Sequence, residues 1–318
     1  MSLFKKSART FAMTAAITGM CCVAWAAPQN YLKLPTPKRI LPLAQAWEGD
    51  EQPHTLSVIE LNKDGYKYWG WFGLNNGRGI GLARSNDLVK WTKYKQNPLW
   101  KNARWASVLK NADPAHPDVL YFAVTRDYDT PSSRIVLATS TDGIHLTEVK
   151  NLVNPADSER NQNPNLFRDP VSGKFFLTYY RGNDDNYFDI VSKSADRIED
   201  LDKAQEKVLM HTTETVAAPT LVYIPKNGAN GKGVYYLATE VYPGRYSTTN
   251  KGVWQVKVFY SDQPDGKFVP TDDNPVQGDE RACLFQHIFN GKFYGYQSHL
   301  NHATDKWEME VLTTPLPK

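Results

Sequence analysis

The sequence predicts an all-β fold, a five-bladed β-propeller whose blades each hold about four antiparallel strands. Two observations lead to it: a short apolar strand recurs five times, and a strand rich in aromatic residues follows each copy. Propellers repeat one such sheet around a central axis, with a regular period in the sequence. The apolar strands lie about 50–60 residues apart and centre on Val58, Val108, Leu166, Leu221 and Leu284.

Each copy reads as an inner strand, a turn, an aromatic second strand and a third strand. The inner strands are expected at 57–59, 107–109, 165–167, 220–222 and 283–285. The second strands are expected at 65–69, 119–122, 173–177, 234–237 and 291–294. Third strands end on polar turns at 84–87, 139–142, 193–196 and 260–262, and the first three share Ser-x-Asp. Such side chains bond their own backbone and fix a bend.

The ends of the repeat indicate how the ring closes. Outer strands are expected at 90–94 and 146–149, and the best helical candidate, 197–205, reads as a local turn of helix. The fifth copy stops after its third strand at 307–314, so we expect residues 31–34 to supply its outer strand. Closure of this kind removes exposed sheet edges. A β-sandwich with coincidental spacing is the alternative fold.

Composition excludes several classes of protein. The 318 residues carry 37 basic and 34 acidic side chains, a net charge of +3, which gives no basis for nucleic-acid binding. Aromatic residues make up 12 % of the chain, enough to bury a core, so disorder is disfavoured. No long apolar run follows residue 27, which excludes a polytopic membrane protein.

The first residues read as a secretory signal peptide. Basic Lys5, Lys6 and Arg9 precede an apolar stretch, 11–26, that ends in Ala-Trp-Ala. A membrane anchor is the alternative. We therefore expect a signal peptide over 1–26 and a single propeller domain over 27–318, secreted or periplasmic and with no membrane contact after cleavage. The mature chain keeps one cysteine, Cys283, and hence no internal disulfide.

Three stretches resemble the five-bladed glycoside hydrolases of family 43 and the related families 32 and 68. The stretch 82–91 resembles their first blade. The Asn163-Pro164 stretch resembles their Asp-Pro strand, and Ala218-Pro219 resembles the strand that opens with Glu-Gly-Pro. The resemblance covers nearly the whole mature chain.

The resemblance implies three carboxylates at the starts of inner strands, and none carries over. Thr55, Asn163 and Ala217 stand at the matching positions. Hydrolysis of a glycosidic bond needs two carboxyl groups, one with a raised pKa that protonates the leaving oxygen. Either the catalytic groups lie a few residues away, or the chemistry is different.

Carboxylates near the expected funnel mouth are the candidates for the catalytic acid and base. Glu214 is our choice for the acid, because its uncharged, partly apolar surroundings in the sequence would raise its pKa. Glu51, near His54, is our choice for the base, and Asp50 is the alternative. Asp127 and Glu240 follow second-strand aromatics, so we expect them at the rim, tuning the pair or binding a hydroxyl.

A second group of residues is expected to bind the sugar. Aromatic faces stack on sugar rings, and the guanidinium group of arginine binds hydroxyls or carboxylates. The candidates are His54, Arg104, Trp105, Arg126, Asn163, Tyr180 and His299, the last resembling the blade-five histidine of family 43. Packing in the core is the alternative role for the aromatic ones.

Other sites are not indicated by the sequence. The seven histidines lack zinc-type spacing, so we expect no metal centre and no cofactor, with a structural calcium near His299 as an alternative role for that residue. Arg168-Asp169-Pro170 is similar to a motif of fructan-cleaving enzymes. Only two residues separate it from the next strand, so we expect Asp169 in a hairpin turn at the opposite end of the blade.

The expected function is hydrolysis of an arabinan-, xylan- or fructan-type poly- or oligosaccharide, and the resemblance to family 43 implies inversion at the anomeric carbon. Two alternatives stay open. One is a glycan-binding propeller without catalysis, and the other is a lyase on uronic-acid polymers that uses His54 or a tyrosine as base and an arginine to neutralise the carboxylate. The expected partner is therefore a carbohydrate, and nothing in the sequence indicates an oligomer, so we expect a monomer.

Overall fold

A computed structural model describes most of the chain after residue 30. The described residues are 31–41, 45–49, 53–74, 78–111, 113, 115–128, 133–156, 160–183, 187–228, 231–244 and 252–318. The signal peptide predicted for 1–26 lies outside them. Among the described residues, no helix is long and apolar enough to span a membrane.

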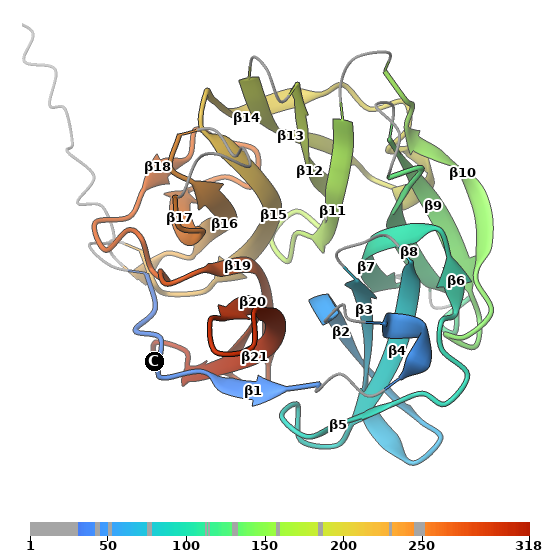
Figure 1. Ribbon diagram of the computed structural model, residues 1–318. Coiled ribbons are helices and arrows are strands. Elements are labelled where there is room, and N and C mark those ends of the chain that lie inside the picture. Colours follow the sequence, from blue (N-terminus) through green and yellow to red (C-terminus); the bar gives the residue numbers. More distant parts are fainter. Residues whose placement is uncertain are drawn as a thin grey trace, which may run out of the picture.

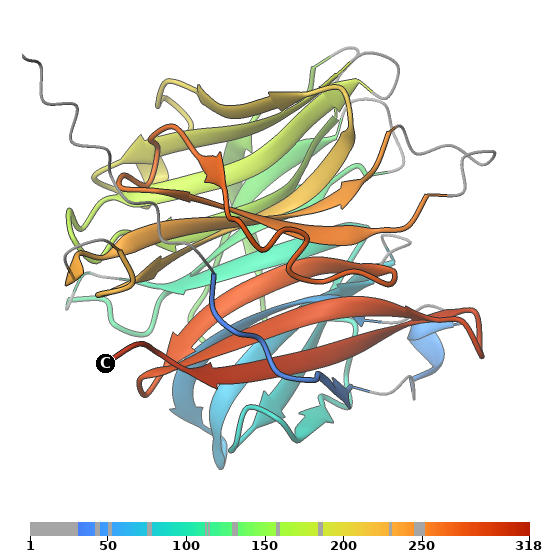
Figure 2. The ribbon, with the colours of Figure 1, turned by 90° about the vertical axis from the view of Figure 1, so that its left-hand side faces the viewer.

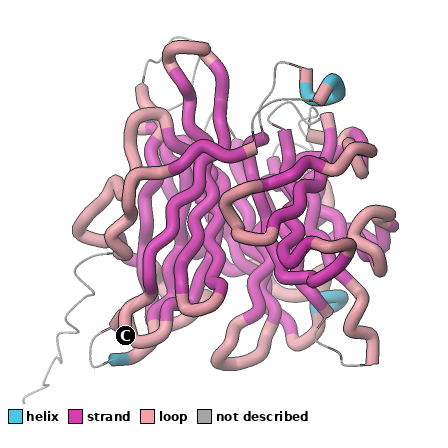
Figure 3. The backbone as a smooth tube through the Cα atoms, turned by 90° about the horizontal axis from the view of Figure 1, so that it is seen from below, coloured by secondary structure: helices cyan, strands magenta, loops and turns pink. Residues whose placement is uncertain are grey.

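Five antiparallel sheets stand around a central axis, so the predicted five-bladed β-propeller is confirmed (Figure 1). Among the described residues the named helices are two short 3₁₀ turns, Ala46–Glu48 and Ile198–Asp200, and strands make up most of the tube in Figure 3. The helical candidate at 197–205 is therefore a single tight turn. In four of the sheets the strands follow one another in sequence order from the centre outwards, and in the fifth β1 lies outside β19, β20 and β21. Their inner members surround the axis (Figure 1).

The first three blades have these strands. Blade I holds β2 (Pro53–Lys63), β3 (Tyr66–Leu74), β4 (Gly79–Ser85) and β5 (Trp91–Lys93), with β6 (Trp100–Lys101) paired to β4. Blade II holds β7 (Ala103–Lys110), β8 (Leu120–Arg126), β9 (Arg134–Ser140) and β10 (Thr147–Val153). Blade III holds β11 (Arg160–Arg168), β12 (Phe175–Asn183), β13 (Tyr187–Ala195) and β14 (Lys207–Thr212).

The last two blades complete the ring. Blade IV holds β15 (Thr215–Ile224), β16 (Val234–Tyr242), β17 (Gln255–Ser261) and β18 (Val269–Pro270). Blade V holds β19 (Arg281–Phe289), β20 (Lys292–Asn301), β21 (Lys306–Pro315) and, from the other end of the chain, β1 (Lys38–Ile40).

The N-terminal segment closes blade V, as predicted, but with different residues. Strand β1 pairs with β21 through Lys38–Val311 and Ile40–Met309, whereas the prediction used residues 31–34. Figures 1 and 2 show this segment running beside β21. The apolar side chains at 31 and 32 pack instead against the core between blades IV and V, and the Tyr31 hydroxyl donates to Gln286. Their hydrophobicity reflects burial in this core, and the prediction that residues 31–34 form the outer strand is wrong.

Side chains of the inner strands bond each blade to the next around the axis. Ser57 Oγ accepts from the backbone N–H of Val108, 3.0 Å away, and Ser107 Oγ accepts from Leu166, 2.8 Å away. The same link continues between blades III and IV through Asn165, and between blades IV and V through the Thr220 hydroxyl. These bonds fix the relative height of the inner strands and therefore the shape of the funnel.

His287 completes this ring between blades V and I. Its Nε2 lies 3.4 Å from the Val58 nitrogen, which donates to it, and the ring stacks on Phe289. Burial lowers the pKa of His287 from 6.5 to about 4. The imidazole is therefore neutral at pH 7, as an acceptor requires.

This lowered pKa predicts a loss of stability in mild acid. Below pH 6.5 the unfolded chain binds a proton at His287 that the folded chain takes up only near pH 4. The folded state should lose about 2 kcal/mol across this window, less than the full shift implies because the ring is partly exposed. Urea unfolding at several pH values measures it. His287→Gln should flatten this part of the profile; an equally steep fall in the variant would contradict the assignment.

Rings of neighbouring blades meet between the sheets and form the core. Trp69, Trp71 and Phe122 are fully buried where blade I meets blade II. Tyr236 and Phe293 fill the corresponding place between blades IV and V. The aromatic second strands thus serve mainly to pack the blades against one another.

The polar turns bond their own backbone as predicted. Ser85 Oγ accepts from the N–H groups of Asp87 and Leu88, and Asp87 Oδ1 accepts from Val89 and Lys90. Asp142 does the same in blade II, where its Oδ1 accepts from the backbone N–H groups of Ile144 and His145.

Asp169 lies in the tight turn between β11 and β12, as predicted, and its side chain is buried. Its carboxylate accepts from Val171 and Ser172 and, at 2.7 Å, from the hydroxyl of Tyr235 in blade IV. Burial acts to raise the pKa of Asp169, but the hydrogen bonds from Ser172 and Tyr235 outweigh it and lower the pKa.

Asp169→Ala should therefore destabilise the fold by about 3 kcal/mol, because Tyr235 and the turn amides lose their acceptor. Thermal or urea unfolding measures this loss. The chemistry expected at the funnel mouth should be unchanged, because the turn that holds Asp169 lies at the opposite end of β11. If the variant is stable but has lost its activity, Asp169 has the catalytic role that the fructan-type motif implies.

Candidate functional site

Each inner strand carries a β-bulge near its start. His54 is the extra residue in β2, between the pairs Pro53–Leu74 and Thr55–Gly73. The bulges of the other four inner strands contain a residue with positive φ: Trp105, Asn163, Ala218 and Cys283, at +48°, +56°, +48° and +53°. Bulges re-aim side chains and tolerate proline, which explains Pro164 and Pro219 in these strands.

The bulges aim one residue from each inner strand into a common cavity of about 330 Å³. Four of these residues directly precede a positive-φ residue, and His54 is the fifth. The five are His54, Arg104, Gln162, Ala217 and Ala282. Further out the wall is formed by Trp105, Tyr128, Arg160, Tyr180, Phe188, Thr215, Glu240, Trp254 and Trp307. Aromatic rings with a few polar groups between them are typical of a small-molecule site.

Glu240 is the one carboxylate among the described residues that line this cavity. It lies on β16, directly opposite Ala217 of β15. Side chains of directly opposed residues share a face of the sheet and have Cβ atoms about 5 Å apart. Because Ala217 is small, Glu240 reaches over it into the funnel.

The surroundings of Glu240 favour the protonated form of its carboxyl group. The side chain is buried, and its Oε2 accepts a hydrogen bond from the Cys283 thiol at 2.9 Å. Burial raises the pKa of Glu240, although the thiol and Arg104 oppose the shift. A carboxylic acid in such a place can donate a proton to a bound oxygen.

His54 and Arg104 lie beside this acid. Burial, with a contribution from Arg104, lowers the pKa of His54 to about 3, so the ring is neutral at pH 7. The Arg104 guanidinium stacks on two rings, with its carbon 3.4 Å from the centre of Trp105 and 3.9 Å from that of Tyr128. The cavity floor thus combines a cation, a neutral imidazole and a buried acid.

Five of the residues predicted for the site meet in this cavity: His54, Arg104, Trp105, Tyr180 and Glu240. Tyr180 points its hydroxyl at Gln162 Oε1, 2.9 Å away. Asn163 is buried directly next to Gln162 but is not part of the cavity wall. Asp50 and Glu51, the candidates for the base, lie outside the described residues.

Glu214 is not among the residues that line the cavity, in contrast to its expected role. Its side chain is 43 % exposed, and the carboxylate is 3.7 Å from Lys257 Nζ. The uncharged surroundings expected from its sequence neighbours are therefore wrong, because β17 brings a lysine alongside.

Three more predicted residues serve contacts outside the cavity wall. Arg126 donates to the carbonyls at 101 and 102, and Asp127 is 2.7 Å from Arg134 Nε. His299 Nδ1 is 3.0 Å from Glu310 Oε1. Their polar groups bind neighbouring strands and turns.

Sequence reasoning missed the outer ring of the cavity. Trp254 and Trp307 come from the loop before β17 and from β21, where strand alternation gives no direction for a ring. Gln162 had a usable signal, because it stands four residues before Leu166, as Arg104 stands four residues before Val108. Aligning these copies on the apolar strand would have identified Gln162, whereas Ala282 stands only two residues before Leu284 and gives no such signal.

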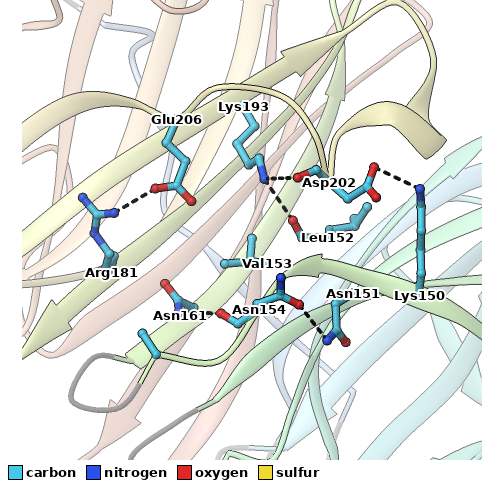
Figure 4. A pocket seen from close by; sticks show the side chains of 11 residues that line it. Lys150, Asn151, Leu152, Val153, Asn154, Asn161, Arg181, Lys193, Asp202 and Glu206 are labelled. Carbon is cyan, nitrogen blue, oxygen red and sulfur yellow. Dashed lines mark hydrogen bonds and ion pairs between the residues drawn. The ribbon is translucent and has the colours of Figure 1, made fainter.

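A second, larger cavity of about 540 Å³ lies between blades II and III (Figure 4). No aromatic residue is among the described residues of its wall, and its charged groups bond to one another or to backbone carbonyls. Lys193 donates to the carbonyls of Leu152 and Asp202, and Arg181 binds Glu206 at 2.8 Å. These bonds join two blades, so the funnel cavity remains the better candidate for a ligand.

Comparison with known proteins supports the fold. The sequence matches no protein-family model and no curated protein. The structure is similar to that of a thermostable family-43 glycoside hydrolase, with a TM-score of 0.63 at 13 % identity over 85 % of this chain and 91 % of that one.

Two other solved structures are similar over nearly their whole length. An N-acetylgalactosamine deacetylase from F. plautii gives a TM-score of 0.64 at 12 % identity, covering 89 % of this chain and 96 % of its own. An endo-arabinase from Bacteroides thetaiotaomicron gives 0.61 at 13 %, covering 84 % and 94 %. At such identities the likeness establishes the fold alone, the five-bladed β-propeller that the sequence resemblance implied.

Proposed function

We propose that this protein cleaves a glycosidic bond in a carbohydrate bound in the funnel cavity, with Glu240 as the proton donor. The observation that carries the proposal is the position of Glu240 opposite Ala217. The family resemblance assigns the catalytic acid to position 217, and Glu240 delivers a buried carboxyl to the same part of the funnel from the neighbouring strand. Its raised pKa suits the role.

The cavity also suits a sugar as ligand. Trp105, Trp254 and Trp307 offer ring faces, and Gln162 and Arg104 offer hydrogen bonds. Proteins of this fold have been solved with blood group B trisaccharide and with arabinohexaose. For the base we retain Glu51, three residues before His54 in the sequence, with Asp50 as its alternative. Inversion requires about 6.5–9.5 Å between the two carboxyl groups.

A second candidate function is elimination on a uronic-acid polymer, favoured by Arg104 beside a neutral His54. Such a lyase needs a cation to hold the substrate carboxylate and a base to remove the neighbouring proton. Arg104 and His54 both line the cavity, and the low pKa of His54 leaves its ring free of the extra proton at pH 7. Glu240 would then protonate the leaving oxygen.

One assay separates these functions. The full-length protein is incubated with a panel of arabinans, xylans, fructans and uronic-acid polymers. New reducing ends without unsaturated sugar support hydrolysis, and unsaturated products support elimination. Binding without any product would leave a glycan-binding propeller and overturn both enzyme proposals. Consistent with the sequence of residues 1–26, we propose that the protein works outside the cytoplasm, as a monomer.

A further inference from the structure

Three buried side chains that can bind a metal meet at the floor of the funnel. His54, Glu240 and Cys283 come from blades I, IV and V, and their ligand atoms all lie within 4.8 Å of one another. Each side chain is more than nine-tenths buried. Ligands in a tetrahedral zinc site lie about 3.5 Å apart, so shifts of about 1 Å would bring these three together.

The histidine has an unused nitrogen at this place. His54 Nδ1 is buried and has no hydrogen-bond partner among the described residues. The ring is held by edge contact with Trp307, 5.3 Å between centres, and the backbone carbonyl of His54 accepts from Ser298. A buried polar atom without a partner destabilises a fold, and a metal ion would satisfy it.

We propose that His54, Glu240 and Cys283 form a binding site for a zinc ion. Imidazole, carboxylate and thiolate are ligands that zinc prefers, and three protein ligands leave a fourth position open to the cavity. Cys283 is a free cysteine, so its thiol is available.

Zinc binding would release the proton of the Cys283 thiol. In the metal-free structure this thiol donates to its hydrogen bond with Glu240. The metal ligand is the thiolate, so the proton must leave when zinc binds.

Bound zinc would prevent Glu240 from acting as the proton donor. A carboxylate bound to zinc has no proton to give, so zinc should inhibit the cleavage proposed above; this consequence rests on the proposed function, whereas metal binding does not. Because the three ligands join blades I, IV and V, bound zinc should also raise the melting temperature.

Cobalt titration of the chelator-treated, full-length protein tests the site. One equivalent of Co²⁺ should give a thiolate-to-cobalt charge-transfer band that Zn²⁺ abolishes. Cys283→Ser should remove the band, and both Cys283→Ser and His54→Gln should weaken Zn²⁺ binding at least ~100-fold. His211→Gln, an exposed histidine paired with Asp189, is the matched control and should leave the affinity unchanged.

Each result decides a different part of the proposal. Absence of the band, or a band that survives Cys283→Ser, would overturn the site, and His54→Gln gives the same decision if Cys283→Ser does not fold. A normal band without zinc inhibition of an active enzyme would overturn the predicted inhibition alone. If no glycan is cleaved, the cobalt band and the melting temperature still test the metal site.

Discussion

Glu240→Gln should lower kcat for glycan cleavage by about 10²–10⁴-fold, the usual contribution of a positioned acid. Gln keeps the shape of the side chain and can still accept from Cys283, but it has no proton to donate to a leaving oxygen. The fold and the affinity for the glycan should stay nearly unchanged. Initial rates with the best substrate from the glycan panel, together with circular dichroism, measure the effect.

Glu214→Gln is the matched control, because Glu214 was the acid predicted from the sequence. Its exposed carboxylate beside Lys257 lies outside the cavity wall, so activity should be retained. If instead Glu214→Gln is inactive and Glu240→Gln is active, the sequence-based assignment is right and the structural one is wrong.

The cross-strand relation between positions 217 and 240 allows a rescue experiment. In Glu240→Ala the cavity has lost its acid, and Ala217→Glu in the same chain returns a carboxyl to the position that the family resemblance assigns. The two Cβ atoms are about 5 Å apart, so we expect part of the lost rate to return. An inactive double variant that folds would indicate that only the β16 position suits the substrate.

Trp71→Ala should produce the largest loss of stability, about 3–5 kcal/mol. The ring is fully buried, meets Phe122 of blade II edge to face at 5.3 Å, and its Nε1–H donates to the Gly143 carbonyl at 2.9 Å. Removal leaves a cavity between blades I and II and an unsatisfied carbonyl. Urea unfolding gives the difference.

Val171→Ala serves as the comparison for this loss. Val171 is 68 % exposed at a hairpin tip, so its truncation should change stability by less than about 0.5 kcal/mol. A Trp71→Ala variant no less stable than Val171→Ala would mean that the aromatic rings do not hold the blades together.

The repeat made the architecture predictable, because each blade must bury one apolar inner strand and one aromatic strand. The inner strands, the Ser-x-Asp turns and the hairpin position of Asp169 all followed from this pattern. The closing strand was misplaced, because hydrophobicity at 31–34 does not distinguish packing from pairing.

The site was less predictable, because bulges decide where side chains point. The extra residue in each inner strand is invisible in a period-two pattern, and only Pro164 and Pro219 hint at it. Likewise, Glu240 could be recognised as a rim residue from its own strand, but its reach over Ala217 depends on the register between β15 and β16. The short distance between Cys283 and Glu240 depends on how blades IV and V pack together.

The most direct test of the central claim is a crystal structure of Glu240→Gln with an oligosaccharide from the glycan panel. We predict sugar in the funnel, with the scissile oxygen within hydrogen-bond distance of residue 240 and a ring against at least one of Trp105, Trp254 and Trp307. Sugar bound instead in the polar cavity between blades II and III (Figure 4), with the funnel free of it, would contradict the claim.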